Sequence, residues 1–194
     1  GKSLMFVEYA AQCRGGSSIA LFIYGWHDAD WCYFISQMEG NYAVMSHATD
    51  RVLDINNLPS QKEEAWKYTP LAKTMPKGLS PSPVSEKVIH CTCGQNGGQS
   101  EDILIVGVDG QAQTEVLHID VEAGVELMLI ERHAGEGAYW KNIRTQITLG
   151  KGAKMTHYRV QEDSVDAVHT NMVDICAEEG SEYNSFTLTK GAKL

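Results

Sequence analysis

Three segments of the chain carry one pattern: VEAGVELMLIE from Val121 to Glu131, LGKGAKMTHYR from Leu149 to Arg159, and AEEGSEYNSFT from Ala177 to Thr187. They align without gaps, and their glycines recur at one even interval, at Gly124, Gly152 and Gly180. In each segment, small or charged residues surround the glycine, and residues of alternating polarity follow it. Alternation with a period of two residues predicts a half-buried β-strand, and a fixed repeat of this length is typical of a solenoid.

A second strand precedes each glycine: TEVLHI from Thr114, NIRTQI from Asn142 and TNMVDI from Thr170. The repeat is therefore a strand, a glycine turn, a second strand and a return, and no helical stretch of useful length interrupts it after Ile103. Strands one period apart would stack at about 4.8 Å, which predicts a mainly β chain folded as a parallel β-helix. The alternative is a meander or sandwich whose hairpins are evenly spaced.

Two short helices and a linker are predicted ahead of the repeats. Residues 46–57 fit one helix. Ser60 and Glu63 form a capping box that begins a second helix, and Pro70 ends it because the residue before a proline avoids helical geometry. Prolines and glycines then recur through residues 74–100, which indicates linker and loops.

Residues 1–44 differ from the rest in composition. Half of the aromatic residues of the chain lie before residue 40, and no helical or strand period holds across this stretch. A polar run after Met45 resembles an ordinary protein start, so we expect an extension before it, with a divergent native segment as the alternative. The predicted organisation is an unmatched N-terminal extension, a helical N-terminal region with a linker, and a parallel β-helix truncated at its C-terminus: residues 1–44, 45–100 and 101–194.

The charge and the cysteines limit the class of protein. With 16 Lys and Arg against 25 Asp and Glu, the net charge is −9 and the isoelectric point is near 5.2. A protein that binds nucleic acid by bulk charge needs a basic face, so we expect no nucleic-acid partner. No stretch approaches the roughly 20 apolar residues of a membrane helix, so no membrane partner is expected. The five scattered cysteines are unlike a secreted disulfide framework, which favours a cytoplasmic location.

One cluster of soft metal ligands stands out in the sequence: His90, Cys91 and Cys93. A structural zinc site normally takes four ligands, with two to four residues between paired cysteines. The single residue between Cys91 and Cys93 makes the spacing tighter, and no second pair lies nearby. We therefore expect loop thiols here and no metal site.

The repeat region also holds the candidates for acid–base chemistry: His118, His133, His157, His169, Glu131, Glu162, Asp163 and Asp166. If strands one period apart stack, His133 lies opposite Gln161, so the histidines do not form a ladder of stacked side chains. We interpret the histidines as exposed or hydrogen-bonded structural residues and the carboxylates as a solvated face. Phosphate-binding loops, nucleophile elbows and zinc-protease motifs are absent from the sequence. We assign no catalytic residue and no metal ligand, and we leave cofactor-binding residues unassigned.

A family resemblance comes from the stretch LPSQKEEAWKYTPL, Leu58 to Leu71. It keeps every element of L-P-[ST]-x-[KR]-x-E-x-W-[KR]-Y-T-x-L and resembles the N-terminal signature of SufD in the SufB/SufD family of the SUF iron–sulfur cluster assembly system. Three further stretches are similar to the early turns of the SufB/SufD core: Ile130–Glu131, Met155–Gln161 and Val168–Asn171. The resemblance covers residues 46–194.

This resemblance implies a right-handed parallel β-helix that belongs to a non-catalytic scaffold subunit. Its implied partners are a SufB-like paralogue and a SufC-like ATPase, in a complex that handles a transient iron–sulfur cluster. No cofactor is expected on this part of the subunit, because the family's functional groups lie in a C-terminal part that no position of this chain matches. The alternatives are a SufB-like paralogue and a parallel β-helix enzyme that acts on polysaccharide.

Overall fold

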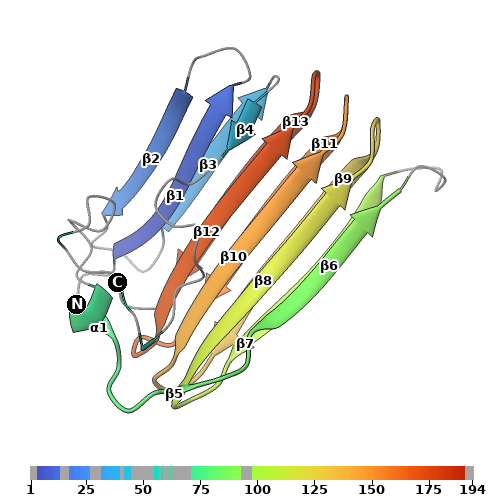
Figure 1. Ribbon diagram of the computed structural model, residues 1–194. Helices are drawn as coiled ribbons and strands as arrows, with labels where there is room; N and C mark the ends of the chain where they lie inside the picture. Colours follow the sequence, from blue (N-terminus) through green and yellow to red (C-terminus); the bar gives the residue numbers. More distant parts are fainter. Residues whose placement is uncertain are drawn as a thin grey trace.

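The computed structural model describes residues 4–13, 18–26, 32–39, 42–44, 55–56, 58, 62, 71–92 and 98–190. Within these ranges, the helical element α1 spans Leu71–Thr74. The strands are, in chain order, β1 (Leu4–Cys13), β2 (Ser18–Trp26), β3 (Cys32–Glu39), β4 (Tyr42–Val44), β5 (Ser80–Pro81), β6 (Ser85–Cys91), β7 (Gln99–Gly107), β8 (Gln111–Val121), β9 (Glu126–Gly135), β10 (Trp140–Leu149), β11 (Lys154–Glu162), β12 (Val168–Ala177) and β13 (Glu182–Lys190). Figure 1 shows most of these strands lying side by side in two layers.

The two layers are two sheets of different composition. The first sheet has the order β2-β1-β4-β12-β10-β8-β5, with β6 also paired to β8, and the second sheet has the order β3-β13-β11-β9-β7. From β6 onward, successive strands alternate between the sheets, and each strand is parallel to the strand one turn later. The chain is therefore mainly β and forms a parallel β-solenoid of about four turns, which confirms the predicted fold class.

The register of the solenoid follows the period found in the sequence. In the first sheet, Trp140 lies opposite Ala112 on one side and Val168 on the other, which is the same interval that separates the repeated glycines. Those glycines have φ angles of 71°, 68° and 73° at Gly124, Gly152 and Gly180, respectively. Residues with a Cβ atom rarely adopt this left-handed backbone conformation, which explains why glycine occupies the turn between the two strands of each repeat.

The prediction that residues 74–100 are linker and loops was wrong, because this segment contains β5, β6 and the start of β7. The repeat pattern did not reveal the first solenoid turn, because the interval between its residues and those of the next turn is not constant. Ile89 lies opposite Ile119 across a longer interval than the one that separates Ile103 from Glu131. The connection from Cys91 to Gln99 is thus two residues longer than the equivalent one in the next turn.

The segment before residue 45 contains four strands, although no strand period is visible in its sequence. Strand β3 pairs antiparallel with β13, β4 pairs antiparallel with β12, and β1 pairs parallel with β12. Backbone pairing of this kind needs no alternation of side chains, so the sequence carried no signal for it. These strands cover the edge that the last solenoid turn would otherwise leave open. That residues 1–44 are an extension stays a prediction.

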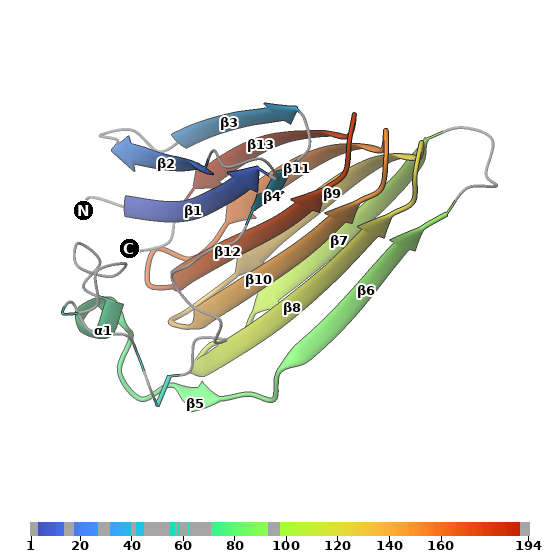
Figure 2. The same ribbon diagram turned by 45° about the horizontal axis from the view of Figure 1, so that its top comes forward.

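The predicted helices over 46–57 and after Ser60 lie almost wholly outside the described residues. The part that is described packs on the outside of the first sheet, at the end where β10 and β12 begin (Figure 2). Leu71 of α1 is buried there with Trp140 and Val168. This contact anchors the segment before the solenoid to the outer surface of the sheet.

A chain that begins at Met45 lacks β1 to β4, so we expect it to associate with increasing concentration or to be poorly soluble. Unpaired backbone N–H and C=O groups of β12 and β13 would then accept strands from other molecules. Light scattering after size-exclusion chromatography measures this, with the 194-residue chain at the same concentration as the control. A monodisperse monomer of the shortened chain at high concentration would contradict the prediction.

Candidate functional site: a buried charge network

The interior of the solenoid changes from apolar to polar along its length. Most interior side chains form one apolar core that runs through all four turns. At the end of the second-sheet strands, however, the inward position occupied by Ile103 in the first turn is taken by Glu131 and then by Arg159 in the following turns. The neighbouring inward position changes from Ile105 to His133 in the same way. Ionisable groups therefore lie where a solenoid of identical turns would have aliphatic side chains.

Glu131 on β9 is the centre of the first half of the network. Its Oε1 accepts hydrogen bonds from His133 Nε2 at 2.6 Å and from Arg159 Nε at 3.2 Å. Its Oε2 accepts from His157 Nε2 at 2.8 Å, and Arg159 Nη2 lies 3.5 Å away. His157 in turn contacts the Tyr183 hydroxyl through Nδ1, at 3.0 Å. The Glu131 carboxylate thus joins β9 to β11, and His157 extends the hydrogen bonds to β13.

Asp163 holds the second half, at the turn between β11 and β12. Its Oδ1 accepts from Lys141 Nζ at 2.7 Å and from the Tyr139 hydroxyl at 2.6 Å. Its Oδ2 lies 2.8 Å from His169 Nδ1. The imidazoles of His133 and His169 meet edge to face with ring centroids 4.6 Å apart, which brings the two halves together.

The Lys141 ammonium group is fully paired although it lies inside the protein. Besides Asp163, it donates to the carbonyl oxygens of Ile105 and Ala134, both at 3.2 Å. An ammonium group has three N–H donors, and the three acceptors match them. Burial of this charge is therefore compensated by direct hydrogen bonds.

Two glycines make room for the ring that completes the network. A Cβ atom at Gly107 or at Gly135 would collide with the Tyr139 ring. These two glycines lie opposite each other in adjacent strands, and the equivalent residue one turn later is Asp163, which the Tyr139 hydroxyl contacts. Both glycines at this corner are therefore needed for the packing of the Tyr139 ring.

The hydrogen bonds to Glu131 assign the tautomers of two buried histidines. Since Glu131 is an acceptor, His133 and His157 must each carry a proton on Nε2. His169 Nδ1 lies 2.8 Å from both Asp163 Oδ2 and Gln161 Nε2, so these contacts do not fix its tautomer. The Nδ1 of His133 and the Nε2 of His169 are buried without a hydrogen-bond partner. The lone pair on His133 Nδ1 is where the network could accept a proton.

The shifted pKa values indicate that Glu131 and Asp163 are ionised and that the imidazoles are neutral, while Lys141 and Arg159 are charged. Burial alone would raise the pKa of Glu131, but Arg159 and the two histidine donors hold it well below its usual value. Burial likewise opposes ionisation of Asp163, yet His169 and Lys141 lower its pKa. Burial also lowers the pKa of Lys141, against the attraction of Asp163.

Burial lowers the pKa of all three interior histidines. For His133, burial and the neighbouring His169 and Lys141 outweigh the hydrogen bond to Glu131 and bring the pKa to about 3. The pKa values of His157 and His169 are lowered by burial as well. With neutral histidines, the charges of the network sum to zero, which is the state a closed interior favours.

The structure brings together most of the histidines and half of the carboxylates singled out in the sequence. His133, His157 and His169 are buried and hydrogen-bonded, and the predicted register of His133 opposite Gln161 is confirmed. That these histidines are purely structural stays a prediction. The interpretation of the carboxylates as a solvated face was wrong for Glu131 and Asp163, which are buried.

The remaining candidates stay outside the network. Glu162 and Asp166 are exposed as predicted, and His118 lies on the outer face of the first sheet, partly exposed. Sequence reasoning missed Lys141, although its position shares the inward parity of the apolar residues that follow it on β10. The alternation of inward and outward positions along a strand was the signal that could have identified Lys141 on β10 and Glu131 on β9.

The soft-ligand cluster of the sequence does not converge. Alternation along β6 puts Cys91 in the core and leaves His90 exposed, within 4 Å of Asp120 and Glu122. Cys93 lies outside the described residues. In the part of the chain that the structure describes, no three His, Cys, Asp or Glu side chains are arranged to hold a metal ion.

The network is arranged for holding strands together. Each carboxylate oxygen of Glu131 and Asp163 already accepts at least one hydrogen bond, and the groups are closed off from solvent. A reactant would have to displace one of these donors to reach them. The arrangement therefore fixes the register of adjacent turns.

Replacing Glu131 with Gln should destabilise the chain by about 3–5 kcal/mol, the cost of leaving a buried charge without its partner, here Arg159. Urea unfolding followed by circular dichroism measures the change. The matched control is Lys151→Gln, which breaks the exposed pair between Lys151 and Glu179 and should change stability little. Equal effects of the two variants would contradict a structural role for the network.

The free energy of unfolding should fall as the pH is lowered from about 6 to about 4.5. Below about 6.5 the unfolded chain binds protons at histidines that the folded chain keeps neutral, because the folded pKa of His133 is about 3. His133→Gln keeps a donor toward Glu131 and should make this pH dependence shallower, by at most about 1.4 kcal/mol per pH unit.

The control for this experiment is His118→Gln, which removes an imidazole of the outer face that lies outside the network. Urea unfolding at a series of pH values gives both slopes. An unchanged slope in His133→Gln would show that this imidazole is not buried as a neutral group.

Comparison with known proteins finds a match to one protein family and to two of its relatives. Residues 103–194 match the model described as "SUF system FeS cluster assembly, SufBD core domain". The protein ABCI7, chloroplastic, of Arabidopsis thaliana is 32% identical over 77 residues, which cover 38% of this chain and 16% of the relative. The iron-sulfur cluster assembly SufBD family protein slr0076 of Synechocystis sp. is 39% identical over 56 residues, which cover 29% of this chain and 12% of the relative.

These matches cover only a small part of the relatives. No solved structure matches the chain significantly. Among the residues that the structure describes, no helix is long and apolar enough to cross a membrane.

The family match begins at Ile103, inside β7, and continues through β13, so it covers the turns that build the buried charge network. Residues 103–194 are therefore similar to the SufBD core domain of SUF iron–sulfur cluster assembly.

Proposed function

We propose that the chain is part of a scaffold subunit of SUF iron–sulfur cluster assembly, working with a SufB-like paralogue and a SufC-like ATPase. The observation that carries the proposal is the agreement between the SufBD core match over residues 103–194 and the parallel solenoid that these residues build. A solenoid is a rigid, extended body that offers long surfaces to partners, which suits a scaffold.

Within the family, a SufD-like subunit is the closer assignment. The signature from Leu58 to Leu71 supports it, because this chain keeps every element. The core match is shared by SufB and SufD, so a SufB-like paralogue is the alternative. The partner that co-purifies distinguishes the two, since a SufD-like chain should require a SufB-like one.

The chain's own contribution is proposed to be structural and non-catalytic. The ionisable groups of the interior neutralise one another in ion pairs, which supports this view. The iron–sulfur cluster is the cargo of the complex, and no residue of this chain is assigned to it. The cytoplasmic location stays part of the proposal, although the name of the Arabidopsis relative places that protein in the chloroplast.

The polysaccharide-acting alternative has no support from the comparisons, whose matches are to SufBD proteins. Release of reducing sugar from acidic polysaccharides by the purified chain would favour it and count against the scaffold proposal.

Co-expression tests the proposed function. The longest reading frame that contains this chain is tagged and co-expressed with the SufB-like and SufC-like proteins of the same genome, and we expect a complex of all three on affinity purification. Omitting the SufB-like protein is the matched control, which should greatly reduce recovery of the assembly. Failure of a folded, tagged protein to retain either partner would overturn the proposal.

A further inference from the structure

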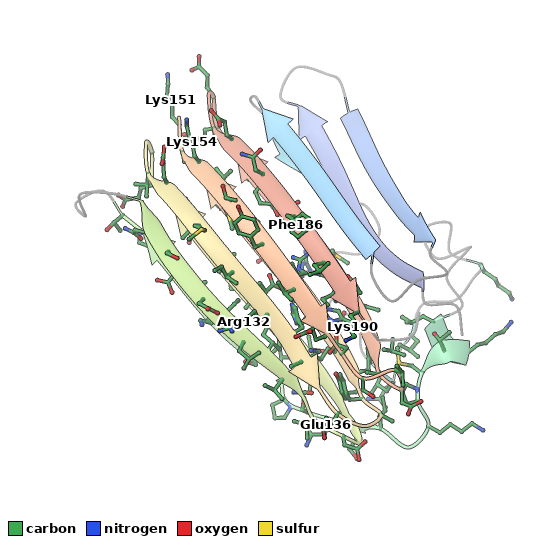
Figure 3. The ribbon with its side chains drawn as sticks, turned by 180° about the vertical axis from the view of Figure 1, so that it is seen from behind. Arg132, Glu136, Lys151, Lys154, Phe186 and Lys190 are labelled. Atoms are coloured by element: carbon green, nitrogen blue, oxygen red, sulfur yellow. The ribbon has the colours of Figure 1, made fainter. Side chains whose placement is uncertain are left out.

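The first turn of the solenoid leaves one strand edge without a neighbour among the described residues. Strand β7 stands at the end of the second sheet and pairs with β9 on one side, whereas β13 at the other end of this sheet is covered by β3. The backbone N–H and C=O groups on the far side of β7 can therefore accept a further strand. Figure 3 shows this edge, with Arg132 in the neighbouring strand β9.

The same turn carries most of the exposed large apolar side chains found in the described residues. Leu104 and Val106 point outward from β7 and are 57% and 51% exposed. Val84, Val88 and Val108, which lie in or next to the strands of this turn, are exposed as well. An extended segment beside β7 would cover part of this apolar surface.

The distribution of charge decides which kind of segment fits the edge. Residues 85–140 hold ten Asp and Glu against one Lys and one Arg, a net charge of −8, while residues 141–194 hold seven charges of each sign. The first two turns thus carry nearly all of the net charge of the chain, −9. In the last two turns, pairs between adjacent strands compensate the charges, as between Arg144 and Asp174.

Two of these carboxylates lie on the edge strand itself. Glu101 and Asp102 are neighbours on β7, so their side chains point to opposite faces of the sheet, and both are exposed. Arg132 on β9 donates to both carboxylate oxygens of Asp102, at 3.0 and 2.9 Å. In the described part of the chain, no ion pair is found for Glu101. The edge therefore presents negative charge that the chain itself leaves partly uncompensated.

We propose that the edge of β7 binds an extended segment of a partner protein in which two basic residues precede an apolar run. Added to the sheet as a further strand, the segment places alternate side chains on the two faces. Its basic residues lie beside Glu101 and Asp102, and its apolar residues lie beside residues 103–106. Backbone hydrogen bonds supply affinity that depends little on sequence, while the opposite charges select the partner.

The same charges disfavour other occupants of this edge. A second copy of β7 would bring the carboxylates of two edge strands together, and like charges on edge strands are a common means by which proteins prevent edge-to-edge pairing. An acidic segment would be repelled by the net charge of −8 on the first two turns. For a basic segment, in contrast, backbone pairing and electrostatic attraction act together.

Two synthetic peptides, acetylated and amidated at their ends, test the proposal: KRIVIVT, and EEIVIVT as its acidic counterpart. Isothermal titration calorimetry with the 194-residue chain measures their binding at low ionic strength. We expect a dissociation constant of about 10–100 µM for the basic peptide, since only one short strand is added. The acidic peptide should bind at least tenfold more weakly, and added salt should weaken binding of the basic one.

Glu101→Lys reverses the charge at the edge and should weaken binding of the basic peptide at least tenfold, while strengthening binding of the acidic peptide. The position is exposed, so the variant should keep the fold, which circular dichroism and thermal unfolding check. The matched control is Glu162→Lys, the same change of charge at an exposed position on β11, two strands away from β7. It should leave the affinity for the basic peptide unchanged within twofold.

Hydrogen–deuterium exchange locates the bound peptide. An added strand should slow exchange of the amides of β7 and leave those of β13 unchanged. The proposal is overturned if the basic peptide does not bind up to about 1 mM, if it binds without slowing exchange in β7, or if Glu101→Lys and Glu162→Lys bind it equally. Protection of β7 that rises with the concentration of the chain alone would identify a second copy as the occupant and would likewise overturn it.

Discussion

The rest of the structure depends on the buried carboxylate of Glu131, which is held by Arg159 and His157 of the next turn and by His133 of its own strand. Removing a carboxylate from water is costly unless its oxygens are paired, so the strands must lie where those donors can reach. A slip of one residue would turn the donors to the other face of the sheet. The apolar core favours stacking of strands in any register that buries apolar side chains, whereas this contact favours one register between β9 and β11.

The fold could be predicted because its signal repeats. The glycines of the turns and the alternation in the strands recur at one fixed period, and the chain cannot alter either without strain or exposure of the core. The first turn could not be found in this way, since its connection after Cys91 is two residues longer. The strands before residue 45 could not be found either, because they are held by backbone pairing at an edge.

The candidate site was only partly predictable, for a different reason. The sequence showed which residues could titrate, but placing them inside or outside required the parity of each strand to be followed to its end. Leu129 and Glu131 both occupy inward positions on β9, so the strand face that carries the buried leucine also carries the carboxylate. The association of His133 with His169 joins two different sheets, and no spacing along the chain encodes that contact.

The network also makes the turns of this solenoid unequal. In an array of identical turns, each repeat contacts only its neighbours in the same way, so a turn can be copied or removed with little penalty. Here Tyr139 needs glycines in the turns before it and a carboxylate at Asp163 in the turn after it. A duplicated turn inserted between β9 and β11 would separate Glu131 from Arg159 and leave both charges buried alone. Such a solenoid can grow or shorten at its ends, while its middle turns must be inherited together as one cooperative unit.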